Sequence, residues 1–143
     1  MMFSRADIMD VIPHRPPFLF VSEILECSER NAVGQHRFDD EYFFKGHFPS
    51  EPIVPGVILI EGLAQTLAFL ALSQVPEHVV MLTGVEKCTI RASVFPGDQV
   101  TYRVAISRTK LKMVVAQCEV LVGTRHILKA TIKGFLTERD KPH

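Results

Sequence analysis

The sequence has little of what marks a secreted, metal-binding or nucleotide-binding protein. Its three cysteines, Cys27, Cys88 and Cys118, are far apart and odd in number, which excludes a disulfide framework and favours a reducing compartment. The six histidines form no HExxH motif and no zinc-type pairing with cysteine. There is also no glycine-rich phosphate loop and no GxSxG motif. We therefore expect a cytoplasmic protein that needs no metal and no cofactor.

The sequence also carries no formal net charge at pH 7. Lysine plus arginine and aspartate plus glutamate both number 16, and nothing in this balance suggests a nucleic-acid binder. The charges are unevenly spread, with nine acids and five bases through Glu51 and seven acids and eleven bases after it. The later bases that cluster in the sequence are Arg91, Arg103, Arg108, Lys110 and Lys112. They form either a solvated strand face or a docking surface for an acidic partner.

No targeting or membrane-spanning segment is evident. Residues Met1–Asp10 contain no apolar stretch of the kind found in signal peptides. The apolar run Val57–Leu72 approaches the roughly 20 residues of a membrane span. However, Glu61 and Gln65 interrupt it, so we expect no span. The length of 143 residues predicts one domain, residues 1–143, with a real hydrophobic core.

The same apolar run predicts a long helix from about Pro55 to Gln74. Proline suits the first helical position, and a helix that is apolar nearly all round must be buried. It nevertheless carries Glu61, and an unpaired buried carboxylate is costly and tends to be protonated. Glu61 is either a structural hydrogen-bonding group or a functional acid. A second titratable group, His47, lies in the proline- and glycine-rich loop just before the helix and favours the functional interpretation.

Strand-like segments surround this helix in the sequence. A short helix capped by Ser4 is expected first, ending near Val11. Alternating or apolar runs then predict strands at Leu19–Glu26, Asn31–Phe38, Val79–Ile90, Val100–Ile106, Lys112–Val122 and Arg125–Leu136. A helix that is apolar on every side needs a sheet to wrap around it. The sequence therefore predicts an α+β hot-dog fold, with a long central helix wrapped by a curved antiparallel β-sheet of about six strands.

Four stretches of the chain form a recognisable set. They are Ile12-Pro13-His14-Arg15-Pro16-Pro17-Phe18-Leu19-Phe20-Val21, Phe43-Phe44-Lys45-Gly46-His47-Phe48-Pro49, Pro55-Gly56-Val57-Ile58-Leu59-Ile60-Glu61-Gly62-Leu63-Ala64-Gln65 and Pro96-Gly97-Asp98. On these motifs the chain resembles the 3-hydroxyacyl-[acyl-carrier-protein] dehydratases of type II fatty acid synthesis. It is most similar to the FabZ kind, with the FabA kind as a close relative. The resemblance covers nearly the whole chain, and the spacing of His47 and Glu61 agrees with it.

The resemblance implies dehydration of a (3R)-3-hydroxyacyl thioester on acyl carrier protein to a trans-2-enoyl thioester. His47 would take the C2 proton and Glu61 would give a proton to the C3 hydroxyl. The backbone N–H of Gly56, at the amino end of the helix, would stabilise the thioester oxygen. The carbonyl of Ile53 would orient the histidine. Because the family builds each site from two chains, a homodimer or a trimer of dimers is implied.

The chain departs from the family pattern at four places. Ser50, Ser22 and Tyr42 replace the usual glycine, aspartate and proline, and Ala92 stands where the family has a basic residue. These departures bear on acyl-chain preference and carrier docking, and leave Arg91 as the candidate docking residue beside Ala92. They suit a specialised pathway, such as polyene or secondary lipid synthesis. Two other functions stay open: a hot-dog thioesterase, and a subunit that completes a partner dehydratase.

Overall fold

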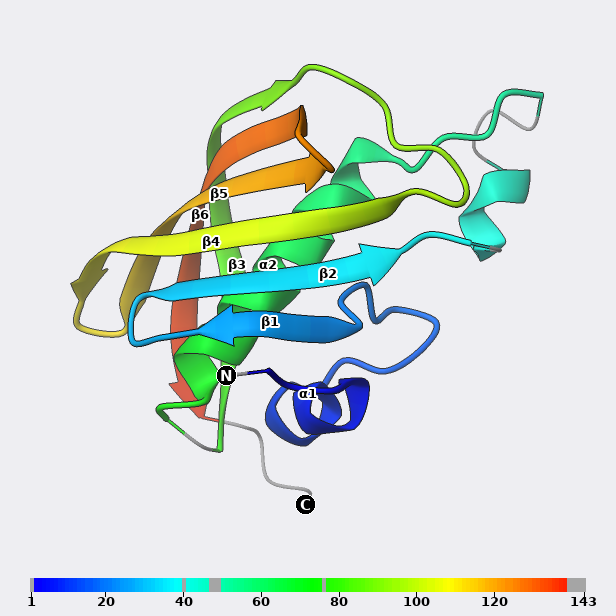
Figure 1. Cartoon of the computed structure of the whole chain (residues 1–143). Coiled ribbons are helices and arrows are strands. Elements are labelled where there is room, and N and C mark those ends of the chain that lie inside the picture. The colour runs from blue at the N-terminus through cyan, green and yellow to red at the C-terminus, as the bar shows by residue number, and fades with distance from the viewer. Residues whose placement is uncertain (1, 40, 47–49, 76, 139–143) are drawn as a thin grey trace.

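The computed structural model describes residues 2–39, 41–46, 50–75 and 77–138 (Figure 1). Its elements are α1 (Arg5–Val11), β1 (Glu23–Cys27), β2 (Asn31–Arg37), the 3₁₀ turn η1 (Tyr42–Lys45), α2 (Gly56–Leu72), β3 (His78–Ile90), β4 (Gln99–Lys110), β5 (Met113–Val122) and β6 (Arg125–Glu138). Ser4 caps α1 through a reciprocal pair of bonds with Asp7, as its sequence predicts.

The six strands form one antiparallel sheet in the order β1-β2-β4-β5-β6-β3. Figure 1 shows this sheet curving around α2. Register shifts interrupt the pairing in several ladders, including Ile24/Glu26, Leu82/Gly84 and Ile106/Arg108, and such bulges bend a strand. The predicted hot-dog fold of about six strands is confirmed.

Several element boundaries differ from the sequence-based expectation. The first strand begins at Glu23 rather than Leu19, because the backbone around Phe18 and Phe20 bonds to the side chain of Gln65 instead of a neighbouring strand. The helix α2 begins at Gly56, with Pro55 as its cap, since the carbonyl of Pro55 accepts the first helical bonds. It ends at Leu72, earlier than the expected Gln74.

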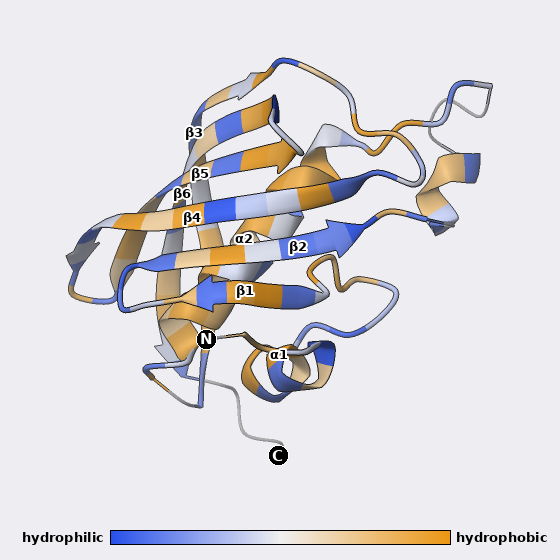
Figure 2. Ribbon diagram, viewed as in Figure 1, coloured by the Kyte–Doolittle hydropathy of each residue, from blue (hydrophilic) through white to orange (hydrophobic). Residues whose placement is uncertain are grey.

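The core lies between α2 and the concave face of the sheet. Leu59, Leu63 and Leu70 of α2 are almost fully buried there, and Figure 2 shows this largely apolar helix behind the strands. The side chain of Tyr102 of β4 packs against Gly62. A Cβ atom added at Gly62 would lie 2.2 Å from the phenol oxygen of Tyr102. Only a glycine lets the helix approach the sheet this closely at that point.

One face of α2 contradicts the expectation that the whole helix is buried. Val57 is 73% exposed, and Ile60, Glu61 and Ala64, which share its face at helical spacing, are only half-buried. None of the helices within the described ranges is long and apolar enough to cross a membrane. The sequence therefore places more apolar surface on α2 than this one sheet covers.

The two edges of the sheet are also unlike each other. Residue Phe3 pairs with Ile24 and covers part of the β1 edge. The other edge strand, β3, is 13 residues long and exposes several large apolar side chains, namely Met81, Leu82, Val85 and Ile90. Long apolar edge strands are prone to pair with another chain. The half-buried face of α2 and the β3 edge adjoin, since Glu61 and Ala64 line the same groove as Met81.

Candidate active site

Glu61 stands on the second turn of α2 at a groove of about 180 Å³. Its side chain is 21% exposed. Apart from His14, Glu61 and Lys133, the groove is lined by apolar side chains and a glycine: Ala64, Leu67 and Ala68 of α2, Val80, Met81 and Leu82 of β3, and Ile132 and Gly134 of β6. A carboxyl group thus lines a mostly apolar groove, as a site for an acyl chain with a reacting end requires.

Gln65 holds the carboxyl group of Glu61 in place from one turn further along α2. Its amide nitrogen donates to Oε2 of Glu61 at 2.9 Å and to the carbonyl of Phe18 at 3.0 Å. Its amide oxygen accepts from the N–H of Phe20 at 2.7 Å. Gln65 is fully buried, and these three bonds use most of its hydrogen-bonding capacity.

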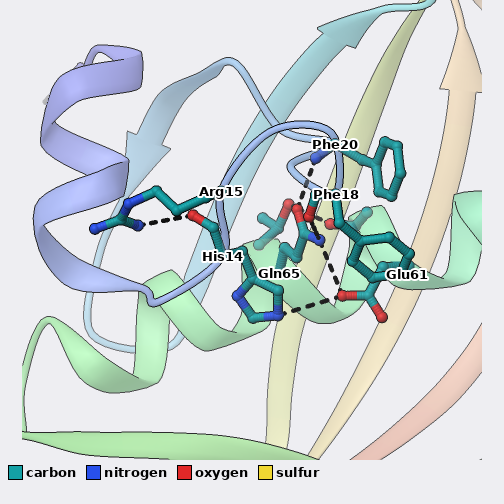
Figure 3. Close-up of polar contacts among 8 residues, drawn as sticks. His14, Arg15, Phe18, Phe20, Glu61 and Gln65 are labelled. Atoms are coloured by element: carbon teal, nitrogen blue, oxygen red, sulfur yellow. Dashed lines mark hydrogen bonds and ion pairs between the residues drawn. The ribbon is translucent and has the colours of Figure 1, made fainter. Parts of the chain in front are cut away.

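His14 approaches the same carboxyl oxygen from the loop that follows α1. Its Nε2 lies 3.4 Å from Oε2 of Glu61. Figure 3 shows the imidazole of His14 and the amide of Gln65 meeting at this one carboxylate. Neither His14 nor Gln65 was predicted from the sequence to contact Glu61. The signals available were a glutamine four residues after a glutamate on one helix face, and a histidine in a proline-rich loop.

The predicted base, His47, lies outside the described residues, so its role remains a prediction. Ile53, whose carbonyl is expected to orient it, is half-buried and adjoins Val54, whose N–H donates to the carbonyl of Val94 at 2.8 Å. This bond ties the segment before α2 to the connection between β3 and β4. The segment that leads into α2 is therefore fastened just before the helix begins.

Gly56 occupies the first position of α2, as expected for the proposed N–H donor. The first N–H groups of a helix have no partner within the helix and favour negative charge. A Cβ atom at this position would lie 2.8 Å from Cδ1 of Ile90, at the end of β3. The glycine therefore lets the strand end lie close to the amino end of the helix.

Arg91 directly follows β3, is exposed, and donates its backbone N–H to Ile127 at 2.8 Å. Since Ile90 lies against Gly56, Arg91 is near the amino end of α2. Arg108 and Lys110 are at the far end of β4, beside the β4–β5 turn. Thr109 there shares a cavity with Ala71, at the carboxyl end of α2. The bases that cluster in the sequence are therefore spread along the molecule by β4.

A second histidine, the buried His36, fastens the segment that precedes η1. Nδ1 of His36 lies 2.6 Å from Oγ of Ser22, and its Nε2 lies 3.4 Å from Oε1 of Glu41. Burial lowers the pKa of His36, although Glu41 opposes this effect. Ser22, one of the departures from the family pattern, is thus a partner of His36. We interpret this cluster as structural, because its contacts join β2 to the start of η1.

The groups suited to binding a metal are dispersed. Within residues 2–39, 41–46, 50–75 and 77–138, no three of the histidine, cysteine, aspartate and glutamate side chains are grouped as metal ligands. Cys27, Cys88 and Cys118 all carry free thiols. That the protein works without a metal or cofactor remains a prediction.

Comparison with known proteins identifies the family. The FabA-like domain family matches residues 12–131. The 3-hydroxyacyl-[acyl-carrier-protein] dehydratase FabZ of Petrotoga mobilis is 38% identical over 133 residues, covering 83% of this chain and 96% of the relative. FabZ of Thermoanaerobacter pseudethanolicus is 38% identical over 139 residues, covering 94% and 98%. This chain therefore belongs to the FabA-like family and, within it, to the FabZ dehydratases.

Solved structures agree on the fold. The dehydratase heterocomplex ApeI:P from Xenorhabdus doucetiae matches with a TM-score of 0.79 at 13% identity, covering 94% of this chain and 91% of that chain. A hypothetical thioesterase with coenzyme A from Streptococcus pneumoniae matches with a TM-score of 0.63 at 13% identity, covering 82% and 87%. Because proteins of both kinds share this fold, the fold alone does not determine the reaction, which follows from the site.

Proposed function

We propose that this protein dehydrates (3R)-3-hydroxyacyl thioesters on acyl carrier protein to trans-2-enoyl thioesters and water, in fatty acid synthesis or a related lipid pathway. Membership of the FabZ family supports the reaction. The observation that carries the proposal is Glu61, a carboxyl group that Gln65 holds in a mostly apolar groove. The free thiols of the three cysteines support a reducing, cytoplasmic setting.

The reaction needs a base and an acid on adjacent carbons. Neutral His47 takes the proton from C2, and Glu61 gives its proton to the hydroxyl on C3. The C3–O bond then breaks, water leaves, and the double bond forms between C2 and C3. The N–H of Gly56 stabilises the negative charge that develops on the thioester oxygen. The apolar groove beside Glu61 takes the acyl chain.

The site is completed by a second copy of this chain. The exposed β3 edge and the half-buried face of α2 that carries Val57 and Ile60 adjoin, and together they form an apolar surface that includes Glu61. Pairing of β3 with β3 of a partner covers this surface and brings the partner's loop to Glu61. The homodimer thus combines Glu61 of one chain with the base of the other.

The substrate arrives on an acidic carrier protein. Arg91 is exposed beside the amino end of α2, where the thioester must lie, and a positive charge there speeds encounter with an acidic partner. Arg108 and Lys110 are too far along β4 to share this role. Arg91 is therefore the docking residue.

The proposal is tested with the purified chain and a set of 3-hydroxyacyl thioesters of different lengths on acyl carrier protein. We expect enoyl products, identified by mass spectrometry as the loss of one water, for a limited range of lengths. Release of free carrier thiol instead would identify a thioesterase. No turnover until a second gene product is added would identify a subunit of a heterocomplex. Either result would refute the proposal.

A further inference from the structure

His14 contacts Glu61 although the proposed acid–base pair leaves it without a task. Its Nε2 is 3.4 Å from Oε2 of Glu61, and its side chain is 26% exposed. Its other ring nitrogen, Nδ1, is buried and has no hydrogen-bond partner among the residues that the structure describes. A buried ring nitrogen without a hydrogen-bond partner costs free energy of folding. The position of His14 beside a carboxyl group therefore calls for a functional explanation.

The loop that carries His14 is built to hold the ring in place. The guanidinium of Arg15 donates to the carbonyls of Ile12, His14 and Met9 at 2.9, 2.7 and 2.8 Å, which fastens the start of the loop to the end of α1. Gln65 fastens the end of the loop to α2 through Phe18 and Phe20 (Figure 3). The imidazole is thus positioned before any substrate binds.

The charge and tautomer of His14 follow from its surroundings. Burial lowers the pKa of His14, Arg15 lowers it further, and Glu61 partly opposes them, so the ring is neutral at pH 7. A proton on Nδ1 would bury an unpaired donor, whereas a bare Nδ1 leaves only a lone pair unpaired. The favoured tautomer therefore carries its proton on Nε2, which faces Glu61.

We propose that His14 is a positioning residue for Glu61, which it assists as a hydrogen-bond donor during dehydration. Nε2–H of His14 and the amide of Gln65 both point to Oε2, so Oε1 is the oxygen that carries the proton for the leaving hydroxyl. This inference rests on the proposed function of Glu61 as the acid.

The contact stabilises the transition state more than the resting acid. At 3.4 Å the N–H is too far from a neutral carboxyl group for a strong hydrogen bond. When the O–H bond of Glu61 breaks and its proton moves to the hydroxyl that leaves C3 as water, the negative charge on the carboxylate strengthens and shortens the contact. An interaction that grows with the developing charge raises kcat.

The other charged groups near this site are already engaged. From β6, Lys133 lines the same groove, but its ammonium pairs with Glu86 at 2.8 Å. The residues that β3 contributes to the groove are apolar. Arg15, the other cation near His14, donates to backbone carbonyls. Within the described part of the chain, His14 and Gln65 are therefore the donors that face Glu61.

Replacement of His14 tests the role directly. In His14→Leu we expect kcat to fall by about 10-fold or more with little change in KM, because a hydrogen bond to a charged group is lost. His14→Gln, which keeps an N–H donor, should restore much of kcat. His126→Leu removes an exposed histidine on β6 and should change neither kcat nor KM.

A purely structural role predicts different results. If His14→Leu keeps the wild-type kcat, or if His14→Gln restores nothing, the inference is wrong even though the wild-type protein still forms enoyl product. Absence of enoyl product from the wild type would instead refute the proposed function. Should the leucine variant fail to fold, ¹⁵N spectra of the imidazoles in the wild-type protein still decide. A neutral ring protonated on Nε2 supports the inference, and a ring that is charged at pH 7 or protonated on Nδ1 overturns it.

Discussion

At the scale of single residues, the site depends on the polar side chains of the apolar helix α2 and on the groups that they contact. Glu61 and Gln65 are neighbours on one face of α2, and Gln65 joins that face to the loop of residues 12–20. Sequence analysis singled out Glu61 because a carboxyl group is unexpected on such a helix. It gave no role to Gln65 or His14, because their importance comes from contacts between segments that are distant in the sequence.

Two histidines should make stability depend on pH. Burial lowers the pKa of both His14 and His36 from the usual value of 6.5, so the unfolded chain binds protons more readily than the folded chain. Their contribution to the free energy of unfolding is fully present above about pH 6.5 and is lost as pH falls through the lowered folded values.

Urea unfolding at fixed protein concentration between pH 7.5 and 5 measures this effect. We expect the free energy of unfolding to decrease toward pH 5, and the decrease to become smaller in His36→Asn. A slope that is the same in the wild type and in His36→Asn would show that neither burial of His36 nor its contacts control this titration.

At the scale of elements, the closeness of α2 to the sheet is set at Gly62. The carbonyl of Gly62 accepts a bond from the hydroxyl of Thr66 at 2.9 Å, and its Cα faces the ring of Tyr102. Sequence patterns predicted the helix and the six strands because apolar periodicity reports elements directly. They did not predict this contact, because the partners come from different elements and a glycine gives no sign of what lies against it.

Gly62→Ala should destabilise the protein although alanine favours helices. A Cβ atom would lie 2.2 Å from the phenol oxygen of Tyr102 and 2.3 Å from Cζ, and overpacking of this kind costs about 1–3 kcal/mol. In a helix without such a contact the same change would stabilise by up to about 1 kcal/mol. The measurement is the midpoint of urea or thermal unfolding.

A double variant identifies the cause. In a Tyr102→Leu background the additional cost of Gly62→Ala should be much smaller, because the atoms that clash are gone. Gly46→Ala is the control, since no heavy atom lies within 4 Å of its added Cβ and its φ is −100°. Additive effects of the two core substitutions would mean that something other than the ring opposes the methyl group.

At the scale of the whole molecule, one chain leaves an apolar edge and an apolar helix face uncovered. The apolar sequence of α2 predicted a helix buried on all sides. The sheet of a single chain leaves Val57 exposed and Ile60 only half-buried. The sequence pattern was informative about burial but could not say which surface provides it. A second copy paired through β3 reconciles the pattern with the structure.

Mixing two inactive variants tests whether each site uses two chains. His47→Ala and Glu61→Gln should each be nearly inactive alone, and mixing them after subunit exchange should restore part of the activity. Some mixed dimers then contain one site with both wild-type groups. Exchange must be verified independently, for example with a tag on one variant. With exchange verified, a mixture as inactive as its components would place both groups of a site within one chain.

Reversing the charge of Arg91 tests the carrier surface. Arg91→Glu should raise KM for a substrate on acyl carrier protein and leave a small thioester mimic almost unaffected, because only the carrier reaches this exposed position. The effect should shrink as salt rises, since exposed charges are screened over roughly 8–10 Å near physiological ionic strength. Arg103→Glu, on the outward face of β4, is the matched control. Equal losses on both substrates would assign Arg91 a structural role.

The central claim is that Glu61 is the acid of a dehydratase, and enoyl formation by Glu61→Gln tests it most directly. The variant keeps the size and hydrogen-bonding capacity of the side chain but has no proton to give at neutral pH. With a 3-hydroxyacyl–acyl carrier protein substrate, kcat should fall on the order of 100-fold or more, while circular dichroism and oligomeric state stay as in the wild type. An enoyl product formed at a rate near that of the wild type would contradict the account.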